Sequence, residues 1–525
     1  MAGKKSEKRK YSHSQQLLDK RLGLLLMVPI AAVIFGITGI PFIRALYLSF
    51  TNKVVGVPEQ FIGFDNYLAL FGDKIYWKSL YNTIIYTVGC ITAKLALGLL
   101  LAVILNQKFR GKAFFRTALL IPWALPGMVA ATTWRWMYDS TYGIINSLLL
   151  KAGLISLPIP WLSNPDITLL STMIVNVWRG VPFFMFSLLG ALQTLDGQIF
   201  EAAYVDGAGM FKRFWYITLP GISSVLGIST LLSTIWTFND FENVFLITGG
   251  GPIYSSSVIS TYTYDLAFIQ NSFGRALSVA VSVIPLMLIL ILVSQMDWMV
   301  MKKRSRIMRT TATYGILMIA LLWTIFPIYW MIKSSLTVNE EMYVARPPLF
   351  SNVITFDHYI DLIYNTSFMH NVWNSFVIAA ITTIICLAIG ILGSYAMTRL
   401  KYPGRSFFRN SIIISYLMPT AVLFVPMYVF VSSLGFYDNK YSLLIIYPTF
   451  VVPYCCYMLI SYFKAIPYAL EEAALIDGCN RLQTLWYIIM PIALPGIAVV
   501  ATFAFTMAWN EYLYAMIMTT SNVQK

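Results

Sequence analysis

Two short clusters of polar and aromatic residues interrupt otherwise apolar stretches of the sequence. The first cluster is Trp236, Phe238, Asn239, Asp240, Glu242 and Asn243, and the second is Trp509, Asn510, Glu511 and Tyr512. Aromatic faces stack on the apolar face of a sugar ring, while carboxylates and amides form hydrogen bonds with its hydroxyl groups. Both clusters are therefore candidate carbohydrate-binding residues. They could equally satisfy one another between helices, or lie near a membrane interface, where Trp and Tyr are common.

A second pair of segments shares one internal spacing. In each copy Glu-Ala-Ala is followed after three residues by Gly, and after nine more by a segment that ends in Pro. The residues are Glu201, Ala202, Ala203, Asp206, Gly207 and Pro220 in the first copy, and Glu472, Ala473, Ala474, Asp477, Gly478 and Pro491 in the second. Glu and Ala favour helix, Gly allows a positive φ, and Pro suits a helix start. We expect a short, partly polar helix and a sharp turn in each copy; the alternative is an amphipathic helix that rests on lipid.

Other kinds of chemistry lack a matching pattern in the sequence. No Gly-x-x-x-x-Gly-Lys-Ser/Thr segment occurs, so the chain has no familiar loop for ATP phosphates. The five Cys and three His residues are scattered, without the spacing of a metal site. No grouping of nucleophile, base and metal ligand is present either, and we expect the chain not to be an enzyme.

The elements that must position these residues are apolar. Hydrophobic residues make up 58% of the chain and charged residues only 11%, whereas soluble domains carry about a quarter charged residues. A helix needs roughly 20 mostly apolar residues to cross a bilayer. Eleven segments meet this requirement, near 23–50, 79–106, 117–138, 166–194, 220–247, 276–300, 313–335, 372–398, 409–433, 442–465 and 492–518. The sequence therefore predicts an all-α, polytopic membrane protein.

The net charge of +14 is concentrated at every second membrane exit. Arg and Lys gather in residues 4–21, 108–116, 302–309 and 399–409, whereas residues 139–165 are nearly free of them. This distribution is typical of cytoplasmic loops and predicts a cytoplasmic N-terminus. It argues against nucleic-acid binding, which a basic face would favour.

The chain also repeats itself. Residues 404–419 resemble residues 111–126 at an offset of 293, since 404 − 111 = 293, and the pairs Asn82-Thr83 and Asn374-Ser375 open corresponding helices. The first half crosses the membrane six times, so the second half begins on the same side and the repeat is parallel. We predict two halves, residues 1–300 with its loop at about 197–219 and residues 301–525 with its loop at about 468–490.

These features together resemble the permease subunits of bacterial ABC importers, and in particular the maltose-type carbohydrate uptake family. The two Glu-Ala-Ala loops are the specific part of the resemblance, although Met490 stands where Leu is usual. Weaker support comes from residues 61–67, 247–252 and 262–268 and from Trp509-Asn510-Glu511. The resemblance implies two six-helix repeats of the type I importer fold, with Asn239 at the sugar-contacting position of the family.

Partners also follow from the resemblance. Each Glu-Ala-Ala loop would be a coupling helix that docks into an ATPase subunit. Two such subunits would bind ATP and Mg, and this chain would hold no cofactor of its own. A solute-binding protein would deliver a sugar, oligosaccharide or related derivative to the outer face of a bacterial plasma membrane.

Several alternatives stay open at this point. An importer permease for amino acids or phosphate is the main competitor, and an ion-driven secondary transporter is another. The second half ends about seven residues after its fifth predicted helix, so it lacks the sixth helix of the family. We expect either a fragment or two separately made subunits in one chain, with a natural fusion also possible.

Overall fold

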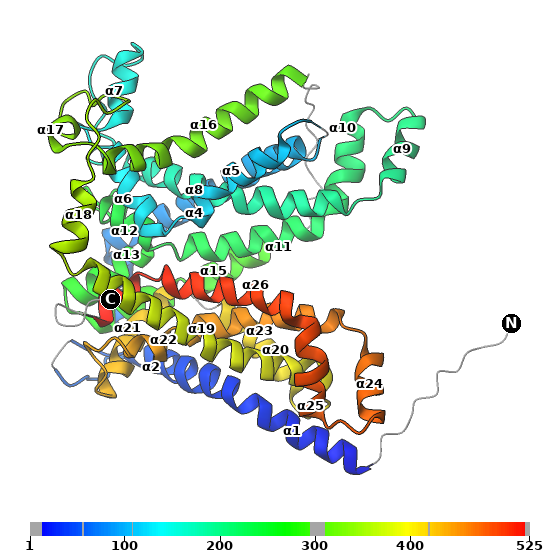
Figure 1. Cartoon of the computed structure of the whole chain (residues 1–525). Coiled ribbons are helices and arrows are strands. Elements are labelled where there is room, and N and C mark those ends of the chain that lie inside the picture. Colours follow the sequence, from blue (N-terminus) through cyan, green and yellow to red (C-terminus); the bar gives the residue numbers. More distant parts are fainter. Residues whose placement is uncertain (1–12, 55–56, 108, 295–309, 418–419, 520–525) are drawn as a thin grey trace. The chain divides into compact units, whose positions relative to one another are not determined.

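The computed structural model is almost entirely helical (Figure 1). It describes residues 13–54, 57–107, 109–294, 310–417 and 420–519. Within these ranges nine helices are long and apolar enough to cross a membrane, and a bent helix pair is a tenth candidate. The prediction of an all-α, multi-pass membrane protein is confirmed.

The helices form two compact units, and unit 2 is residues Leu48–Thr366. Its centre is built by α4, α8 and α11, and α16 packs against α5 and α6. Leu101, Phe184 and Leu226 belong to the buried core of these helices. The helices of unit 2 are α3 (Asp65–Gly72), α4 (Lys74–Leu105), α5 (Lys112–Ala124), α6 (Gly127–Met137), α7 (Ile144–Lys151), α8 (Thr168–Gln193), α9 (Gly197–Val205), α10 (Met210–Arg213), α11 (Leu219–Phe238), α12 (Glu242–Thr248), α13 (Ile259–Tyr264), α14 (Phe273–Ser282), α15 (Ile284–Ser294), α16 (Thr310–Ser335), α17 (Asn339–Met342) and α18 (Asp357–Tyr364).

Unit 1 combines residues Met1–Tyr47 with residues Ser367–Lys525. Its centre is α19, which packs against α1, α23 and α26. Ile30, Tyr395 and Val452 are fully buried in its core. The helices of unit 1 are α1 (His13–Ala31), α2 (Ile40–Leu48), α19 (Phe368–Arg399), α20 (Arg405–Leu417), α21 (Thr420–Ser433), α22 (Ser442–Ile446), α23 (Pro448–Ala465), α24 (Tyr468–Ile476), α25 (Arg481–Thr484), α26 (Met490–Trp509) and α27 (Leu513–Met518).

The first helix of each predicted half packs on the other half. In unit 1 the α1 residue Ile30 fills the space beside Gly393 of α19, where a Cβ atom would lie 1.9 Å from the Ile30 Cδ1 atom. In unit 2 the indole N–H of Trp178 in α8 donates to the α16 carbonyls of Trp323 and Thr324, at 3.1 and 3.2 Å. The compact units therefore differ from the sequence repeats in where these two helices belong.

Two of the predicted spans are broken. Residues 117–138 form α5 and α6, which meet at an angle of 94° around Leu125 and Pro126 instead of forming one straight helix. The segment predicted at 220–247 stops at Phe238, and α12 starts only at Glu242. The physical reason for the first break is Pro126, because a residue before proline avoids the helical region, and Leu125 has ψ 140°.

Pro220 and Pro491 lie in the first turn of α11 and α26, as the sequence pattern predicts, but each helix continues a preceding helical segment. The helical path is continuous from Phe214 to Phe238 and from Arg481 to Trp509. A π-helical turn precedes each proline, Phe214–Thr218 before Pro220 and Leu485–Ile489 before Pro491. Such a local widening accommodates a proline that has no N–H to donate.

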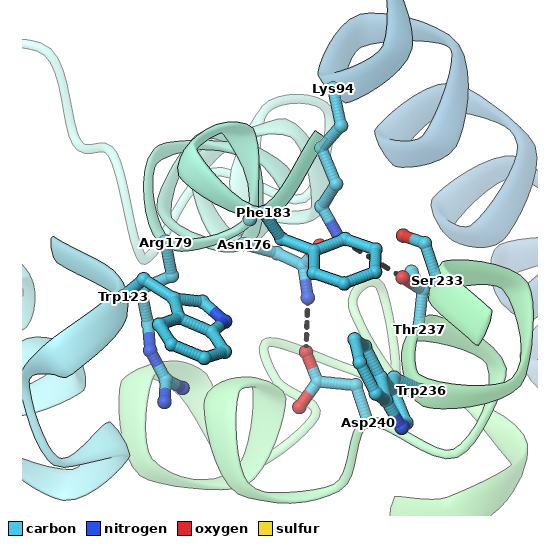
Figure 2. Close-up of a pocket in the computed structure, with 10 residues that line it drawn as sticks. Lys94, Trp123, Asn176, Arg179, Phe183, Ser233, Trp236, Thr237 and Asp240 are labelled. Carbon is cyan, nitrogen blue, oxygen red and sulfur yellow. Dashed lines mark hydrogen bonds between the residues drawn. The ribbon is translucent and has the colours of Figure 1, made fainter. Parts of the chain in front are cut away.

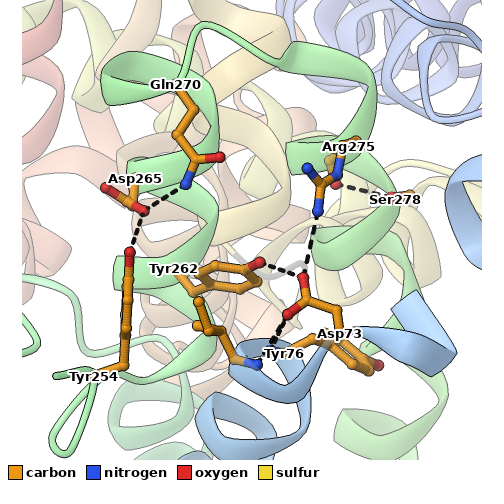
Figure 3. A network of polar contacts seen from close by, with 9 residues as sticks. Asp73, Tyr76, Tyr254, Tyr262, Asp265, Gln270, Arg275 and Ser278 are labelled. Carbon is orange, nitrogen blue, oxygen red and sulfur yellow. Dashed lines mark hydrogen bonds and ion pairs between the residues drawn. The ribbon is translucent and has the colours of Figure 1, made fainter. Parts of the chain in front are cut away.

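Asp73 ties the start of α4 to α13 and α14 (Figure 3). Its carboxylate accepts hydrogen bonds from the backbone N–H groups of Ile75 and Tyr76, at 2.9 and 3.2 Å. It also accepts from the Tyr262 hydroxyl and lies 3.4 Å from the Arg275 guanidinium. Burial and this carboxylate raise the pKa of the Tyr262 hydroxyl. Asp73 thus fixes α13, where the glycine-rich loop that follows α12 ends.

The repeated Asn-Thr pair holds the same loop. The Asn82 amide donates to the carbonyls of Ser255 and Ser257, at 3.0 and 2.9 Å, and the Thr83 hydroxyl accepts from the N–H of Ile259 at 2.9 Å. Gly249 has φ 63°, which ends α12 in a left-handed turn. These bonds hold the loop between α12 and α13 against α4.

Candidate functional site

A cavity of about 210 Å³ lies within unit 2, between α4, α5, α8 and α11 (Figure 2). Helices α4 and α8 and the break after α11, which are distant in the sequence, contribute charged groups to its wall. The lining residues are Lys94, Trp123, Asn176, Arg179, Gly180, Phe183, Ser233, Trp236, Thr237 and Asp240. Gly180 leaves room for the Lys94 side chain, because a Cβ atom there would lie 2.4 Å from the lysine Cε atom.

Asp240 is fixed at the break after α11. Its carboxylate accepts hydrogen bonds from the Tyr86 hydroxyl at 2.7 Å and from the Asn176 amide at 2.6 Å, and the backbone N–H of Asn243 donates to it at 3.2 Å. The last bond caps the start of α12. Asp240 therefore has both a structural role at the break and a place in the cavity wall.

Aromatic side chains form another part of the wall. The rings of Phe183 and Trp236 meet edge to face, with centroids 5.0 Å apart, and Trp123 lies opposite them in Figure 2. Aromatic rings beside amide, hydroxyl and charged groups can bind a molecule that has both an apolar face and many hydroxyl groups. A sugar ring has these properties.

The structure separates the first predicted cluster into two groups. Trp236 and Asp240 line the cavity. Phe238 and Asn243 are buried instead, and the Asn243 amide donates to the Tyr86 hydroxyl and the Thr172 carbonyl, at 2.9 and 3.0 Å. These two residues contribute to packing and hydrogen bonding between helices.

The other two members of the first cluster also point elsewhere. The Asn239 amide donates back to the carbonyl of Ile235 in its own helix, at 2.8 Å. Glu242 lies against the first residue of α6, since a Cβ atom on Gly127 would be 2.2 Å from its Oε2 atom. A helix N-terminus attracts a carboxylate in this way. Glu242 also lies 4.0 Å from Arg179.

The second predicted cluster occupies the equivalent break in unit 1. Trp509 stacks on Phe505 with a centroid distance of 5.6 Å, and the Asn510 N–H closes the end of α26. Glu511 accepts from the N–H groups of Tyr514 and Ala515, at 2.8 and 3.1 Å. It therefore caps α27 as Asp240 caps α12, and Tyr512 directly precedes that helix. A substrate role for these residues stays a prediction.

Sequence reasoning missed most of the cavity wall. Lys94 is the clearest omission, because a lysine within a 32-residue apolar helix is visible in the sequence. Charged residues within membrane helices are costly and are functional candidates by default, and the same signal marks Arg179 in α8. The uncharged residues Trp123, Asn176 and Phe183 carry no comparable signal.

The first Glu-Ala-Ala loop forms a short, exposed helix at one end of unit 2 (Figure 1). Asp196 caps α9 by accepting from the Gln198 N–H at 2.9 Å, and Gly207 ends it with φ 72°. No residue of α9 is buried, and Tyr204 and Val205 are 71% and 84% exposed. Glu201, Ala202 and Asp206 lie on this exposed helix, and Ala203 is partly exposed. The predicted short helix and glycine turn are present.

The second loop has the same shape but a firmer attachment. Gly478 ends α24 with φ 92°; Glu472, Ala473 and Asp477 are exposed, whereas Ala474 is buried. Glu471, which sequence reasoning did not single out, is fully buried, and its Oε1 atom lies 2.6 Å from Nε of Arg399. Burial raises the pKa of Glu471, and the nearby Arg399 and Arg481 partly oppose this effect.

A further ion pair braces the same loop. Arg481 of α25 binds Asp19 of α1 through two hydrogen bonds of 3.0 and 2.9 Å. By contrast, the cation–π contact between Arg213 and the Tyr204 ring, at 5.6 Å, holds α9. Both loops present acidic and apolar side chains to the surroundings, and such a surface can bind a protein partner.

Comparison with known proteins finds one family in both halves of the chain. The family described as the binding-protein-dependent transport system inner membrane component matches residues 94–305 and 389–523. The trehalose/maltose transport system permease protein MalF of Thermococcus litoralis is 33% identical over 273 residues, which cover 52% of this chain and 91% of that protein. The sulfoquinovosyl glycerol transport system permease protein SmoG of Agrobacterium fabrum is 34% identical over 265 residues, covering 50% and 85%.

A solved bacterial ABC transporter involved in the import of the acidic polysaccharide alginate is 20% identical, with a TM-score of 0.48; the match covers 55% of this chain and 99% of that one. The family match includes one segment from each half, and each contains one Glu-Ala-Ala loop and one break after it. The chain therefore belongs to the family of binding-protein-dependent transport system inner membrane components.

Proposed function

We propose that this chain is the membrane-spanning permease of an ATP-driven importer that passes a sugar or oligosaccharide into a bacterial cytoplasm. The cavity of unit 2 carries the carbohydrate assignment, because Trp123, Phe183 and Trp236 supply aromatic faces beside Asn176 and Asp240. The relatives named for trehalose/maltose and for sulfoquinovosyl glycerol support the same substrate class.

The energy comes from separate ATPase subunits, which bind ATP and Mg. We propose that α9 and α24 dock into these subunits through Glu201, Glu472 and the exposed residues around them. ATP can shift the permease between its inward-open and outward-open states only through contacts that differ between those states. The two glycine turns at Gly207 and Gly478 set the angle of each docking helix. This chain performs transport, and hydrolysis belongs to the partners.

The description of the family supports two further parts of this proposal, the solute-binding protein and the membrane location. A solute-binding protein presents the sugar at the outer face, and the chain lies in the bacterial plasma membrane with its N-terminus in the cytoplasm. The Arg and Lys residues of 4–21, 108–116, 302–309 and 399–409 support this orientation.

Uptake by the reconstituted complex tests the substrate class. The chain is placed in proteoliposomes with its ATPase and binding protein, and ATP-dependent uptake of labelled neutral and acidic oligosaccharides is compared with uptake of labelled amino acids and phosphate. We expect uptake of an oligosaccharide. Uptake of amino acids or phosphate alone refutes the carbohydrate assignment.

Charge reversal of the two loops tests coupling. The double variant Glu201→Lys, Glu472→Lys alters two exposed side chains, so we expect the membrane part to stay folded. Transport per ATP hydrolysed should fall by about tenfold or more, because charge pairs at the interface with the ATPase are lost. Glu340→Lys is the matched control, because Glu340 is exposed in a different loop. Unchanged transport in the double variant contradicts the docking role.

A further inference from the structure

Lys94 and Arg179 bring two positive charges to the wall of the cavity in unit 2 (Figure 2). Lys94 is only 5% exposed and lies well inside α4, and Arg179 lies in the interior of α8. Burying a charge is costly unless it is paired and hydrogen-bonded. The partners of these two groups within the protein therefore decide what the cavity can accept.

The protein leaves much of their hydrogen-bonding capacity unused. The Lys94 ammonium group has three N–H donors, and among the described residues only the Thr237 hydroxyl accepts from it, at 3.0 Å. No described residue accepts a hydrogen bond from the Arg179 guanidinium, whose ion-pair partner Glu242 is 4.0 Å away. Lysine and arginine can donate three and five hydrogen bonds respectively.

Asp240 does not accept a hydrogen bond from Lys94 or Arg179. It is the carboxylate among the lining residues, and its oxygens already accept from Tyr86, Asn176 and the N–H of Asn243. None of the ion pairs between described residues joins Asp240 to Lys94. Apart from the Asn176 Oδ1 atom, which has no hydrogen-bond partner among the described residues, the unused capacity noted on this side of the cavity belongs to the two cationic donors.

The scaffold does not require these charges. The second half aligns without gaps in both helices, with Gly98 matching Gly390 and Pro182 matching Pro453. In that alignment Cys386 stands at the position of Lys94, and Phe450 stands at the position of Arg179. The same helices thus pack around a thiol and an aromatic ring, so packing alone does not explain the two cations.

We propose that the cavity binds a saccharide with an acidic group, a carboxylate or a sulfonate, through Lys94 and Arg179. This inference rests on the proposed function and narrows its substrate class. The acidic group receives charge-assisted hydrogen bonds from both side chains, while Trp123, Phe183 and Trp236 cover the ring. A neutral sugar brings no anion to the buried Lys94 ammonium or to the partly exposed Arg179 guanidinium, so the cavity discriminates against it.

The test compares two labelled disaccharides, digalacturonate and maltose, in the reconstituted complex with its ATPase and binding protein. Direct binding of each disaccharide to the complex without the binding protein is measured as well, so that selection by that protein is separated from selection by the cavity. Lys94→Met and Lys94→Arg are compared with the parent chain. Lys333→Met is the matched control, because Lys333 is also buried in a membrane helix, 7% exposed, but lies outside the cavity wall.

We expect digalacturonate to be bound and taken up, and Lys94→Met to lower both by about tenfold or more, the loss typical of a hydrogen bond between charged groups. Lys94→Arg should retain most of the activity, and Lys333→Met should leave the ratio of the two disaccharides unchanged. Binding and uptake of maltose alone, or a digalacturonate affinity that Lys94→Met does not change, overturns the inference but not the carbohydrate assignment. Uptake of neither disaccharide, with uptake of amino acids or phosphate, refutes both.

Discussion

The buried ion pair between Arg399 and Glu471 predicts a large, non-additive effect on the stability of unit 1. The two side chains are 7% and 0% exposed, and their Nε and Oε1 atoms are 2.6 Å apart. Arg399 also donates to the carbonyls of Phe463 and Ile466, at 2.6 and 2.7 Å. The pair therefore joins the Glu-Ala-Ala loop of α24 to the ends of α19 and α23.

The two single variants should differ in their cost. Arg399→Met leaves a buried carboxylate without its cation, and breaking a buried pair in this way costs about 3–5 kcal/mol. Glu471→Gln leaves the arginine with two carbonyl acceptors, so it should cost less, about 1–3 kcal/mol. In the double variant no charge is left unpaired, and the loss should be smaller than the sum of the two by about 2 kcal/mol or more.

Thermal unfolding of the purified complex measures this cycle, and for a unit of this size each kcal/mol shifts the midpoint by about 2–4 °C. The matched control is Glu472→Gln, which alters the exposed neighbour of Glu471 and should have no measurable effect. Additive losses in the double variant, within about 0.5 kcal/mol, would refute the assignment of a coupled pair.

The same pair has a dependence on pH with a definite sign. Burial raises the pKa of Glu471 in the folded state, and Arg399 opposes this rise. Arg399→Met should therefore raise the pKa of Glu471 further. A carboxyl whose pKa is higher in the folded state binds more protons there, so its contribution to stability falls as the pH increases from the unfolded to the folded pKa. Lowering the pH should restore part of the stability of Arg399→Met, and the double variant with Gln should show no such recovery.

Two further predictions concern the coupling loop and the packing of α4. Cys479 is partly exposed beside Gly478, whereas Cys455 is fully buried, so a water-soluble maleimide should label Cys479 first. Bound ATPase should slow the labelling of Cys479. Equal labelling with and without ATPase contradicts docking at this loop. Gly98→Ala should destabilise unit 2 by about 1–3 kcal/mol, because the new Cβ atom would lie 2.4 Å from Cβ of Phe184. Gly390→Ala should cost less, because its nearest contact would be at 3.0 Å. Equal thermal unfolding midpoints for the two variants contradict the close packing of Gly98 against Phe184.

The sequence was sufficient for features that depend on local patterns. Apolar length predicts most of the membrane helices, although residues 409–433 fall in two shorter helices, α20 and α21. The two Glu-Ala-Ala segments predict short helices ended by glycine turns, as α9 and α24 show. The polar clusters lie at the breaks after α11 and α26, where the sequence predicted continuous helices. Their role is more limited than expected, because Asn239 bonds to its own helix and Asn243 bonds to neighbouring helices.

Features that depend on helix pairing could not be read from the sequence. Neither α1 nor α16 has an apolar stripe on one face, so the sequence does not indicate which neighbours these helices contact. Asp19 is a charged residue near the start of α1, but its partner Arg481 is 462 positions away. The cavity has the same origin, since α4, α5, α8 and α11 each supply a few of its residues.

The two halves share one scaffold but distribute their charged residues differently. The matched positions show this difference directly: Lys94 corresponds to Cys386 in the second half, and Glu471 corresponds to Phe200 in the first. A buried charge that packing does not require needs another reason to be present. The cations of unit 2 face a cavity, whereas the ion pairs of unit 1 brace the second Glu-Ala-Ala loop. We therefore predict that the two functions fail separately. Variants at Lys94 should change which solute moves, and variants at Glu471 should change the stability of the loop that we propose couples movement to ATP.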